Sequence, residues 1–256
     1  RSTRRWRAAV RLVAWNIRAG GGRRWSGIVA QLRRWRPDVI ALSEFRGTEP
    51  SQQIAAALNQ AGWIHQSQTT LPEAPAVNAL LLASRWPLQT LRPPSCVQAP
   101  ARWLQAQVRA PQPMAVLLVH VPNRVTGTKY PFLNSMATMA GGWRGVPGLI
   151  VGDTNTGRIG MDEESSAFNR VEDDWMQAME SLGWHDGFRH LHPRRRQFTW
   201  YSPNGDNGFR LDQAFLQPAL LQRMRRCVHR WGGAGSGRQT VLSDHAALIL
   251  DFHRED

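Results

Sequence analysis

Hydrophobic and polar residues follow two different periods along this chain, one typical of helices and one typical of strands. Residues 26–36 carry apolar side chains at helical spacing and end before Pro37, which predicts an amphipathic helix. Apolar runs of strand length, 8–17 and 38–45, lie on either side of it. The chain therefore begins as strand, helix and strand.

The rest of the chain continues this mixed pattern, with more predicted strands than helices. Helices are expected at 51–62, about 131–143 and about 171–182. No internal repeat or long linker divides the sequence, so we predict one α/β domain over 1–256, with 1–7 as a flexible basic arm. The further strands are expected at 77–84, 103–109, 114–121, 148–153, 197–201, 210–216, 225–231 and 245–252.

The charge balance adds information about partners. Lys and Arg number 32 against 19 Asp and Glu, for a net charge of +13, and Lys129 is the only lysine. Every charged residue before Asp38 is an arginine, and a second basic cluster, "RHLHPRRRQ", spans 189–197. Such a chain is attracted to polyanions, and aromatic residues among the arginines could stack on bases. A solvated arginine-rich surface is the alternative interpretation.

Several classes of protein are excluded or disfavoured. No run of 18 apolar residues exists, so a membrane span is not expected. Cys96 and Cys227 are too far apart for a CxxC motif and are expected to be two buried thiols, with one disulfide as the alternative. No P-loop, nucleophile elbow or zinc-ligand spacing is present. The location is not fixed by the sequence: the arginine-rich composition favours the cytoplasm, and secretion stays open because the start, which lacks Met and a signal-type apolar region, resembles a processed or truncated end.

Polar residues of catalytic type stand at the ends of many predicted strands. Each one alone is ambiguous, because a strand-end Asn or Asp is commonly a turn residue and a single His commonly a buried imidazole. Their repetition at the same position favours a catalytic cluster, because strand ends at one edge of a sheet converge. The residues are Asn16, Glu44, His120, Asp153, Asn155, Asp212, Asp244 and His245.

This set of side chains indicates one kind of chemistry. Carboxylates with Asn and His suit a hard cation such as Mg²⁺, which is held by one or two acids and several waters beside a phosphate. Hydrolysis of a phosphodiester requires an activated water, a cation on the phosphate oxygens and a group that stabilises the developing charge. We therefore predict a Mg²⁺-dependent phosphodiesterase, with Mn²⁺ as an alternative ion.

Seven short motifs follow one another along the chain: "WNIRAG" (15–20), "SEF" (43–45), "HVPN" (120–123), "VGDTNT" (151–156), "FTWYS" (198–202), "FRLDQAFL" (209–216) and "SDHAAL" (243–248). In this order they resemble the motifs of the endonuclease/exonuclease/phosphatase superfamily, the fold shared by deoxyribonuclease I and exonuclease III. The resemblance implies a four-layered α/β sandwich, in which two packed, mostly antiparallel sheets are flanked by helices. The site would lie across one end.

The resemblance also implies a role for each residue near the metal and the attacking water. Glu44 would be the principal Mg²⁺ carboxylate, with Asn16 beside it and Asp244 as a further acid near the metal. Asp153 would act as general base on the attacking water, or hold it together with Asn155.

Further implied roles concern the phosphate and the leaving group. His245 would lie against the scissile phosphate, with its other ring nitrogen held by Asp212. Asp244 and His245 would point to opposite sides, as consecutive strand residues do. His120 would donate a hydrogen bond or a proton near the leaving group.

The expected substrate is DNA. Segment 186–220 is most similar to the exonuclease III and abasic-site endonuclease branch, and the net charge agrees with a DNA partner. His120 replaces the Tyr usual in that branch, so abasic-site activity stays open beside endonuclease and exonuclease activity. The expected substrate-binding residues are Asn123, Arg194, Arg195, Arg196, Phe209 and Arg210.

Two other functions are weighed against a DNA nuclease. A phosphodiesterase or phosphatase of the same superfamily acting on lipid headgroups would use the basic face on an anionic membrane. A DNA-binding module without catalysis is disfavoured, since the catalytic-type residues are all present. We expect a monomer without a stable protein partner.

Overall fold

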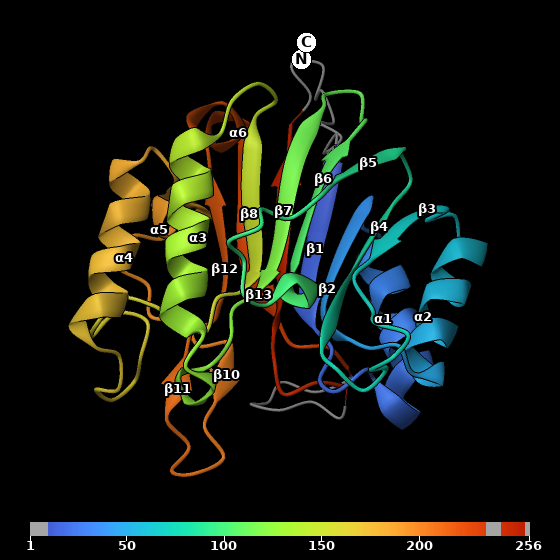
Figure 1. The fold of residues 1–256 in the computed structure, drawn as a ribbon, viewed down its shortest axis with the longest axis horizontal. Coiled ribbons are helices and arrows are strands. Elements are labelled where there is room, and N and C mark those ends of the chain that lie inside the picture. Colours follow the sequence, from blue (N-terminus) through green and yellow to red (C-terminus); the bar gives the residue numbers. More distant parts are fainter. Residues whose placement is uncertain (1–9, 234–241, 254–256) are drawn as a thin grey trace, which may run out of the picture.

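The computed structural model describes residues 10–233 and 242–253, which form two six-stranded sheets packed face to face between helices (Figure 1). The first sheet has the order β13 (Met224–Arg230), β14 (Ala247–Phe252), β1 (Val10–Asn16), β2 (Val39–Phe45), β4 (Ala79–Ser84), β3 (His65–Gln68). The second has the order β5 (Leu88–Leu91), β6 (Trp103–Val108), β7 (Met114–His120), β8 (Gly148–Asp153), β12 (Asp212–Leu216), β9 (His185–Asp186).

Most neighbouring strands in both sheets are antiparallel. Each sheet contains one parallel pair, β1 with β2 and β7 with β8. The predicted four-layered α/β sandwich is therefore confirmed. The arm predicted at 1–7 lies outside the described residues.

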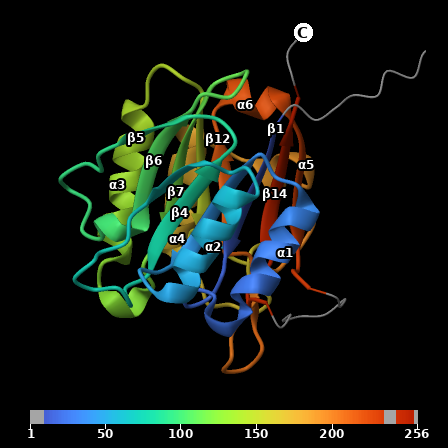
Figure 2. The same cartoon turned by 90° about the vertical axis from the view of Figure 1, so that its right-hand side faces the viewer.

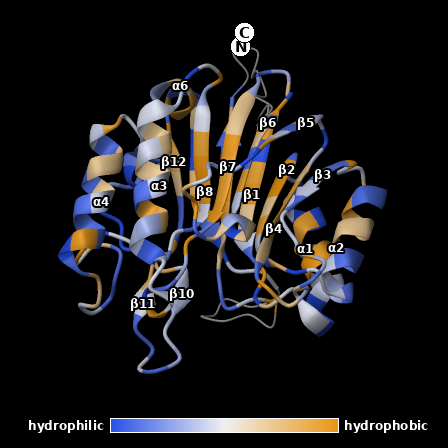
Figure 3. Cartoon of the chain, viewed as in Figure 1, coloured by the Kyte–Doolittle hydropathy of each residue, from blue (hydrophilic) through white to orange (hydrophobic). Residues whose placement is uncertain are grey.

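Side chains alternate across each strand and so build three apolar layers. In β1, Leu12 and Ala14 face the second sheet, whereas Val13 and Trp15 face the helices on the outside. All four are at most 2% exposed. The strands consequently read as continuous apolar runs, and Figure 3 shows them as the most hydrophobic part of the chain.

Two helices cover the outer face of each sheet. α1 (Trp25–Trp35) and α2 (Glu49–Gln60) pack on the first sheet, as Figure 2 shows from the side. α3 (Lys129–Gly142) and α4 (Arg170–Ser181) pack on the second. The start of α4 is fixed by a capping box, in which the Asn169 side chain accepts from the Glu172 N–H and Glu172 accepts from the Asn169 N–H.

The remaining elements are short. A hairpin of β10 (Trp200–Tyr201) and β11 (Gly208–Phe209) projects beyond the sheets at one end (Figure 1). The others are α5 (Gly187–Leu191), α6 (Pro218–Arg223) and the 3₁₀ turns η1 (Gly22–Arg24), η2 (Pro100–Arg102) and η3 (Arg124–Thr126).

The predicted helices and strands are present with their ends shifted by a few residues, except that the strand expected at 197–201 is reduced to β10. Six short elements were missed: β3, β5, β9, β11, α5 and α6. Strand β3, "HQSQ", has no apolar residue and so no periodic signal. Both cysteines are free thiols, as expected; Cys227 is buried, but Cys96 is exposed, so the expectation of burial is wrong for Cys96. In the part of the chain that the structure describes, no helix has the length and apolarity to cross a membrane.

The topology brings one end of both sheets together as a possible site. Strands β1, β2, β7 and β8 end there, whereas β4, β12 and β14 run antiparallel to their neighbours and begin there. Gly152 allows β8 to reach this end close to β7, because it has a φ of +138° and a Cβ would stand 2.0 Å from the Val119 oxygen. The next residue is Asp153.

Candidate active site

A cavity of about 250 Å³ lies at this end, between the ends of the two sheets. It collects seven of the residues predicted from the sequence, although they are spread over most of the chain. These are Glu44, His120, Asn123, Asp153, Asn155, Asp244 and His245, and the lining is completed by Asn78, Arg102, Trp200 and Leu211.

Glu44 reaches the cavity through an irregularity in β2. Its φ is +54°, a left-handed value that is costly for a residue with a Cβ, and the pairing of β2 with β4 shifts register at this position. A bulge of this kind redirects a side chain at the end of a strand. The Ala19 N–H donates to Glu44 Oε2 at 2.7 Å, which fixes the carboxylate.

Asn16 bridges two carboxylates of the site. Its Nδ2 donates to Glu44 Oε1 at 3.2 Å and to Asp153 Oδ2 at 3.0 Å, and its Oδ1 accepts from the Arg18 N–H at 2.9 Å. The amide oxygen accepts one hydrogen bond and keeps a second lone pair, so the role predicted for Asn16 beside the metal stays a prediction, next to its positioning of the two carboxylates.

Asp153 is the most strongly perturbed acid of the cavity. Burial raises its pKa to about 7, with Asp212 adding to the increase and His245 and Asn16 opposing it. Its Oδ1 accepts from the Asn155 N–H at 3.0 Å. An acid with a pKa near neutrality suits a general base, because it can both take and release a proton.

His245 carries the opposite electrostatic character. Burial disfavours the charged ring, but Asp212 raises the pKa of His245 to about 10, helped by Asp153 and Asp244. Asp212 Oδ2 lies 3.0 Å from His245 Nδ1, and His245 Nε2 lies 3.9 Å from Asp153 Oδ2. The ring is therefore an imidazolium at neutral pH, with Nε2 free to face an anion.

The residues before β14 form a turn and not the start of a strand. Ser243 Oγ donates to the Asn16 carbonyl at 2.6 Å and accepts from the His245 N–H at 3.2 Å. Asp244 and His245 both line the cavity, and the expectation that one faces the metal and the other the phosphate stays a prediction. Strand alternation does not apply, because β14 begins only at Ala247.

His120 has a neutral ring. The sequence left open whether it donates a hydrogen bond or a proton near the leaving group. Burial lowers the pKa of His120 well below its ordinary value, and the charges of Arg102 and His245 lower it further. Its Nε2 lies 3.7 Å from Asp153 Oδ2. A neutral imidazole can donate one hydrogen bond, so this role fits the structure, whereas donation of a proton by a charged ring does not.

The donors in the cavity fit a divalent cation. Asp244 Oδ1 is buried and has no hydrogen-bond partner among the described residues, which leaves a carboxylate oxygen unsatisfied. Glu44 supplies oxygen donors to the same cavity, and such ligands suit Mg²⁺ or Mn²⁺. Within 10–233 and 242–253, no three His, Cys, Asp or Glu side chains form a metal cage on their own. Water and a substrate phosphate would complete the coordination.

A second cavity of about 190 Å³ adjoins the first and shares Asn123, Asn155, Trp200 and Leu211 with it. Three aromatic side chains, Phe168, Trp200 and Phe209, form part of its wall, and Arg124 and Lys129 add positive charge. Lys129 also donates to the Asn155 carbonyl and to buried Glu172, which ties the loop after β8 to α4. Ala167 completes the lining, and Phe209 was predicted to bind substrate.

Arg210 was predicted to contact substrate, and the structure corrects this. The side chain is fully buried and is held by Asp162 and Asp186 through charge-assisted hydrogen bonds, including 2.8 Å from Nε to Asp162 Oδ1. Arg210 therefore links β12 to the loop after β8 and to the start of α5. It cannot reach a ligand, because no part of it is exposed.

The three consecutive arginines divide into two groups. Arg196 donates to the Glu163 and Glu164 carbonyls and so holds the acid-rich loop after β8. Arg194 and Arg195 are exposed and line neither cavity, so they stay available for a polyanion outside the cavity.

Four polar residues of the two cavities were missed from the sequence: Asn78, Arg102, Arg124 and Lys129. Asn78 is the second residue of the strand predicted at 77–84, and this place near a strand end could have marked it, since other site residues occupy strand ends. Arg102 stands in the turn η2 before β6, where no pattern distinguished it from other arginines. Lys129 begins α3, and its only signal was that it is the single lysine.

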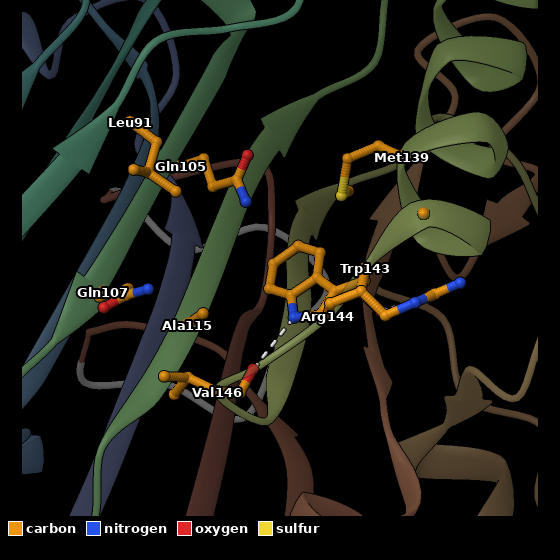
Figure 4. A pocket seen from close by; sticks show the side chains of 9 residues that line it. Leu91, Gln105, Gln107, Ala115, Met139, Trp143, Arg144 and Val146 are labelled. Carbon is orange, nitrogen blue, oxygen red and sulfur yellow. Dashed lines mark hydrogen bonds between the residues drawn. The ribbon is translucent and has the colours of Figure 1, made fainter.

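Another cavity, of about 200 Å³, lies on the outer face of the second sheet, away from the strand ends (Figure 4). Gln105 and Gln107 of β6 face Trp143, which follows α3, and the Trp143 indole donates to the Val146 carbonyl at 3.0 Å. None of the predicted site residues lines it.

The four-layered fold and the acids and imidazoles at one end define a phosphoester hydrolase. The chain belongs to the Endonuclease/Exonuclease/phosphatase family, whose sequence model matches residues 13–245. This confirms the resemblance found in the motifs.

Solved structures share the fold at low sequence identity. An AP endonuclease from Archaeoglobus fulgidus is 18% identical, with a TM-score of 0.79 over 95% of this chain and 99% of that one. The 3′ phosphatase NExo from Neisseria, bound to product DNA hairpin, is 20% identical, with a TM-score of 0.79 over 96% and 100%. The catalytic domain of APE2 from Xenopus laevis is 16% identical, with a TM-score of 0.72 over 95% and 91%. No curated protein sequence matched the chain significantly.

Proposed function

We propose that this protein is a divalent-cation-dependent DNA phosphodiesterase that cleaves a phosphodiester bond with an activated water. The observation that carries the proposal is the pairing, in one cavity, of an acid of raised pKa with a charged imidazole. Burial raises the pKa of Asp153 to about 7, whereas Asp212 keeps His245 positively charged. Both pKa values are raised, so near neutral pH the acid can accept a proton while the imidazole stays charged, which divides the base and cation roles between the two groups.

Each residue has a role that follows from its position. Glu44 and Asp244 would hold Mg²⁺ or Mn²⁺, which would polarise the phosphate and stabilise charge on its oxygens. Asp153 would accept a proton from the attacking water, and Asn155 would orient that water. His245 would donate from Nε2 to a phosphate oxygen, and its positive charge would stabilise the developing negative charge.

Asn155 can orient water because only one end of its amide is occupied. Its Nδ2 donates to the Val121 carbonyl at 2.7 Å, so its Oδ1 is directed away from that partner, and the residue lines the cavity. Its φ of +46° is a left-handed value that Asn tolerates better than most residues. Lys129, which donates to the Asn155 carbonyl, stabilises this conformation.

DNA is the proposed substrate for three reasons. The net charge is +13, and the exposed Arg194 and Arg195 stand apart from the backbone hydrogen bonds of Arg196 and the ion pairs of Arg210. The aromatic cavity beside the catalytic one could receive the sugar or base next to the scissile phosphate. The structures that share the fold include an AP endonuclease, a 3′ phosphatase bound to a DNA hairpin, and APE2.

A panel of substrates tests this function. The protein would be incubated with Mg²⁺, with Mn²⁺ or with chelator on plasmid, linear duplex, single strand, abasic duplex, 3′-phosphorylated duplex and RNA. We expect cleavage of DNA that stops with chelator and that a His245→Ala variant lacks. Cleavage of RNA alone, or of no nucleic acid, would refute the proposal.

Lipid phosphodiesters remain the second candidate because of one exposed side chain. Val125 is 95% exposed at the tip of η3, beside Arg124 at the rim of the aromatic cavity. An apolar tip next to a cation suits a membrane surface as well as DNA. Vesicles containing a phosphodiester headgroup therefore belong in the same panel, and hydrolysis of them without cleavage of DNA would favour this candidate.

A further inference from the structure

We propose that Asn78 is a further substrate-contacting residue, whose side-chain N–H donates to one non-bridging oxygen of the scissile phosphate while Arg46 orients its amide. The inference rests on the proposed phosphodiesterase function and adds a residue to it. Neither residue belongs to the set that the strand-end pattern and the motifs identified.

The position of Asn78 follows from strand pairing. It directly precedes β4, which runs antiparallel to β2, and Ala79 pairs with Phe45. Asn78 therefore stands beside the bulge that carries Glu44, on the neighbouring strand. It is half-buried and lines the catalytic cavity together with Glu44.

Arg46 decides which way the Asn78 amide faces. Arg46 Nε donates to Asn78 Oδ1 at 2.7 Å, and a guanidinium has only donors, so the oxygen must face Arg46. The Nδ2 group therefore points away from Arg46. Among the described residues, none accepts a hydrogen bond from Asn78 Nδ2. This group therefore has two N–H donors available, on a residue that lines the cavity.

The charges around the cavity explain what this donor would bind. On the side of β2 and β4, the lining consists of Glu44 and Asn78, and Glu44 offers only carboxylate oxygens. The cationic lining residues, Arg102 and His245, come from the turn before β6 and the turn before β14. Asn78 therefore supplies an N–H donor beside Glu44. Without it, a phosphate oxygen on this side of the cavity would lie against a carboxylate alone. A neutral donor avoids an additional ion pair that would neutralise Glu44.

The test exploits the chirality of phosphorus. A duplex that the wild type cleaves at one position would be made with a methylphosphonate at that position, as two separate diastereomers, each lacking one non-bridging oxygen. Both diastereomers lose the same charge, so a difference between them reports a contact to one particular oxygen. Binding would be measured by fluorescence anisotropy in chelator and in Ca²⁺, which makes the readout independent of cleavage.

We expect the wild type to bind one diastereomer about three- to tenfold more weakly than the other, the size of a hydrogen bond to an uncharged oxygen, because a methylphosphonate is neutral. In Asn78→Ala this difference should shrink to less than about twofold. Asn78→Asp keeps the acceptor for Arg46 but replaces the N–H with oxygen, so binding of the natural duplex should weaken at least as much as in Asn78→Ala. Arg46→Gln should reduce the preference partially, because the amide is then free to turn over.

Controls separate the possible outcomes. Asn134→Ala, an exposed position on α3, should keep the wild-type preference. Thermal unfolding of each variant would show that the fold is retained, and Asn78→Ser, which keeps a smaller donor, would replace any variant that fails to fold. An unchanged diastereomer preference in folded Asn78→Ala would overturn the assignment. A wild type that cleaves no nucleic acid would instead contradict the proposed function.

Discussion

Replacing Asp212 with Asn should convert His245 from a charged ring into a neutral one. The raising of the His245 pKa to about 10 from its ordinary 6.5 favours the imidazolium by roughly 5 kcal/mol, at 1.36 kcal/mol per tenfold change. Burial opposes the charge, and Asp212 makes the largest contribution in its favour through its charge and the 3.0 Å hydrogen bond. Without that charge, we expect the pKa to fall near or below 6.5.

The consequence for catalysis follows from the loss of the cation. At pH 7.5 the variant would carry a mostly neutral imidazole against the phosphate, and the rate should fall about 10²- to 10³-fold, the usual cost of one preorganised donor. Asn is isosteric with Asp, so DNA binding should change little. The rate would be measured under single-turnover conditions on a labelled duplex, together with the imidazole proton signals by NMR between pH 5 and 10.

The same substitution has a consequence for stability that provides an independent check. A group whose pKa is raised on folding stabilises the native state fully below its unfolded pKa and loses this as pH rises through the folded value. The wild type should therefore lose free energy of unfolding relative to Asp212→Asn between about pH 6.5 and 10. If His245 in the variant still titrates near pH 10, or the rate is unchanged, the electrostatic account of the site is wrong.

Three further predictions concern other parts of the molecule. Asp153→Asn should lower Mg²⁺-dependent plasmid cleavage by orders of magnitude while DNA retention in a gel-shift assay stays the same; undiminished cleavage would remove its role as base. Arg194→Ala combined with Arg195→Ala should flatten the dependence of log Kd on log salt by up to about 2. A slope equal to that of the wild type would show that both arginines belong to a solvated surface that does not bind DNA. Burial opposes the charge of Asp162, but Arg210 and Arg189 lower its pKa to about 2. The stabilisation that the buried pair of Asp162 and Arg210 provides should therefore disappear as pH falls through about 2. Asp162→Asn should cost roughly 3–5 kcal/mol at pH 7 by urea unfolding and show less acid dependence, and neutral-pH stability equal to wild type would contradict the buried ion pair.

The fold could be predicted where burial creates a periodic pattern. Strands β1, β7 and β8 are buried on both faces, so their sequences are continuous apolar runs that can be recognised without the structure. Edge strands such as His65–Gln68 are stabilised by pairing with one neighbour, and their sequence has no apolar alternation. Elements formed by tertiary pairing alone therefore escape a periodicity analysis.

The site could be predicted as a set of residues but not as a set of roles. The strand-end rule identified Glu44, Asp153 and His245, because chain direction fixes which strand ends meet. It could not show that Asn16 bridges two carboxylates, or that Arg210 points into the core. Those outcomes depend on partners far away in sequence, such as Asp153 for Asn16 and Asp162 for Arg210.

Several contacts between residues far apart in sequence join the two sheets at their catalytic ends. Asn16 of the first sheet donates to Asp153 of the second. His245, which precedes β14 of the first sheet, likewise pairs with Asp212 of the second. His229 Nε2 from β13 lies 2.9 Å from the Asp212 carbonyl, which accepts, so the ring must carry its proton on Nε2. Sliding of one sheet past the other would disturb all three contacts at once. The geometry of the site is therefore set by packing of the apolar layer between the sheets, which explains why acids and imidazoles can stay aligned in a cavity otherwise formed by loops and strand ends.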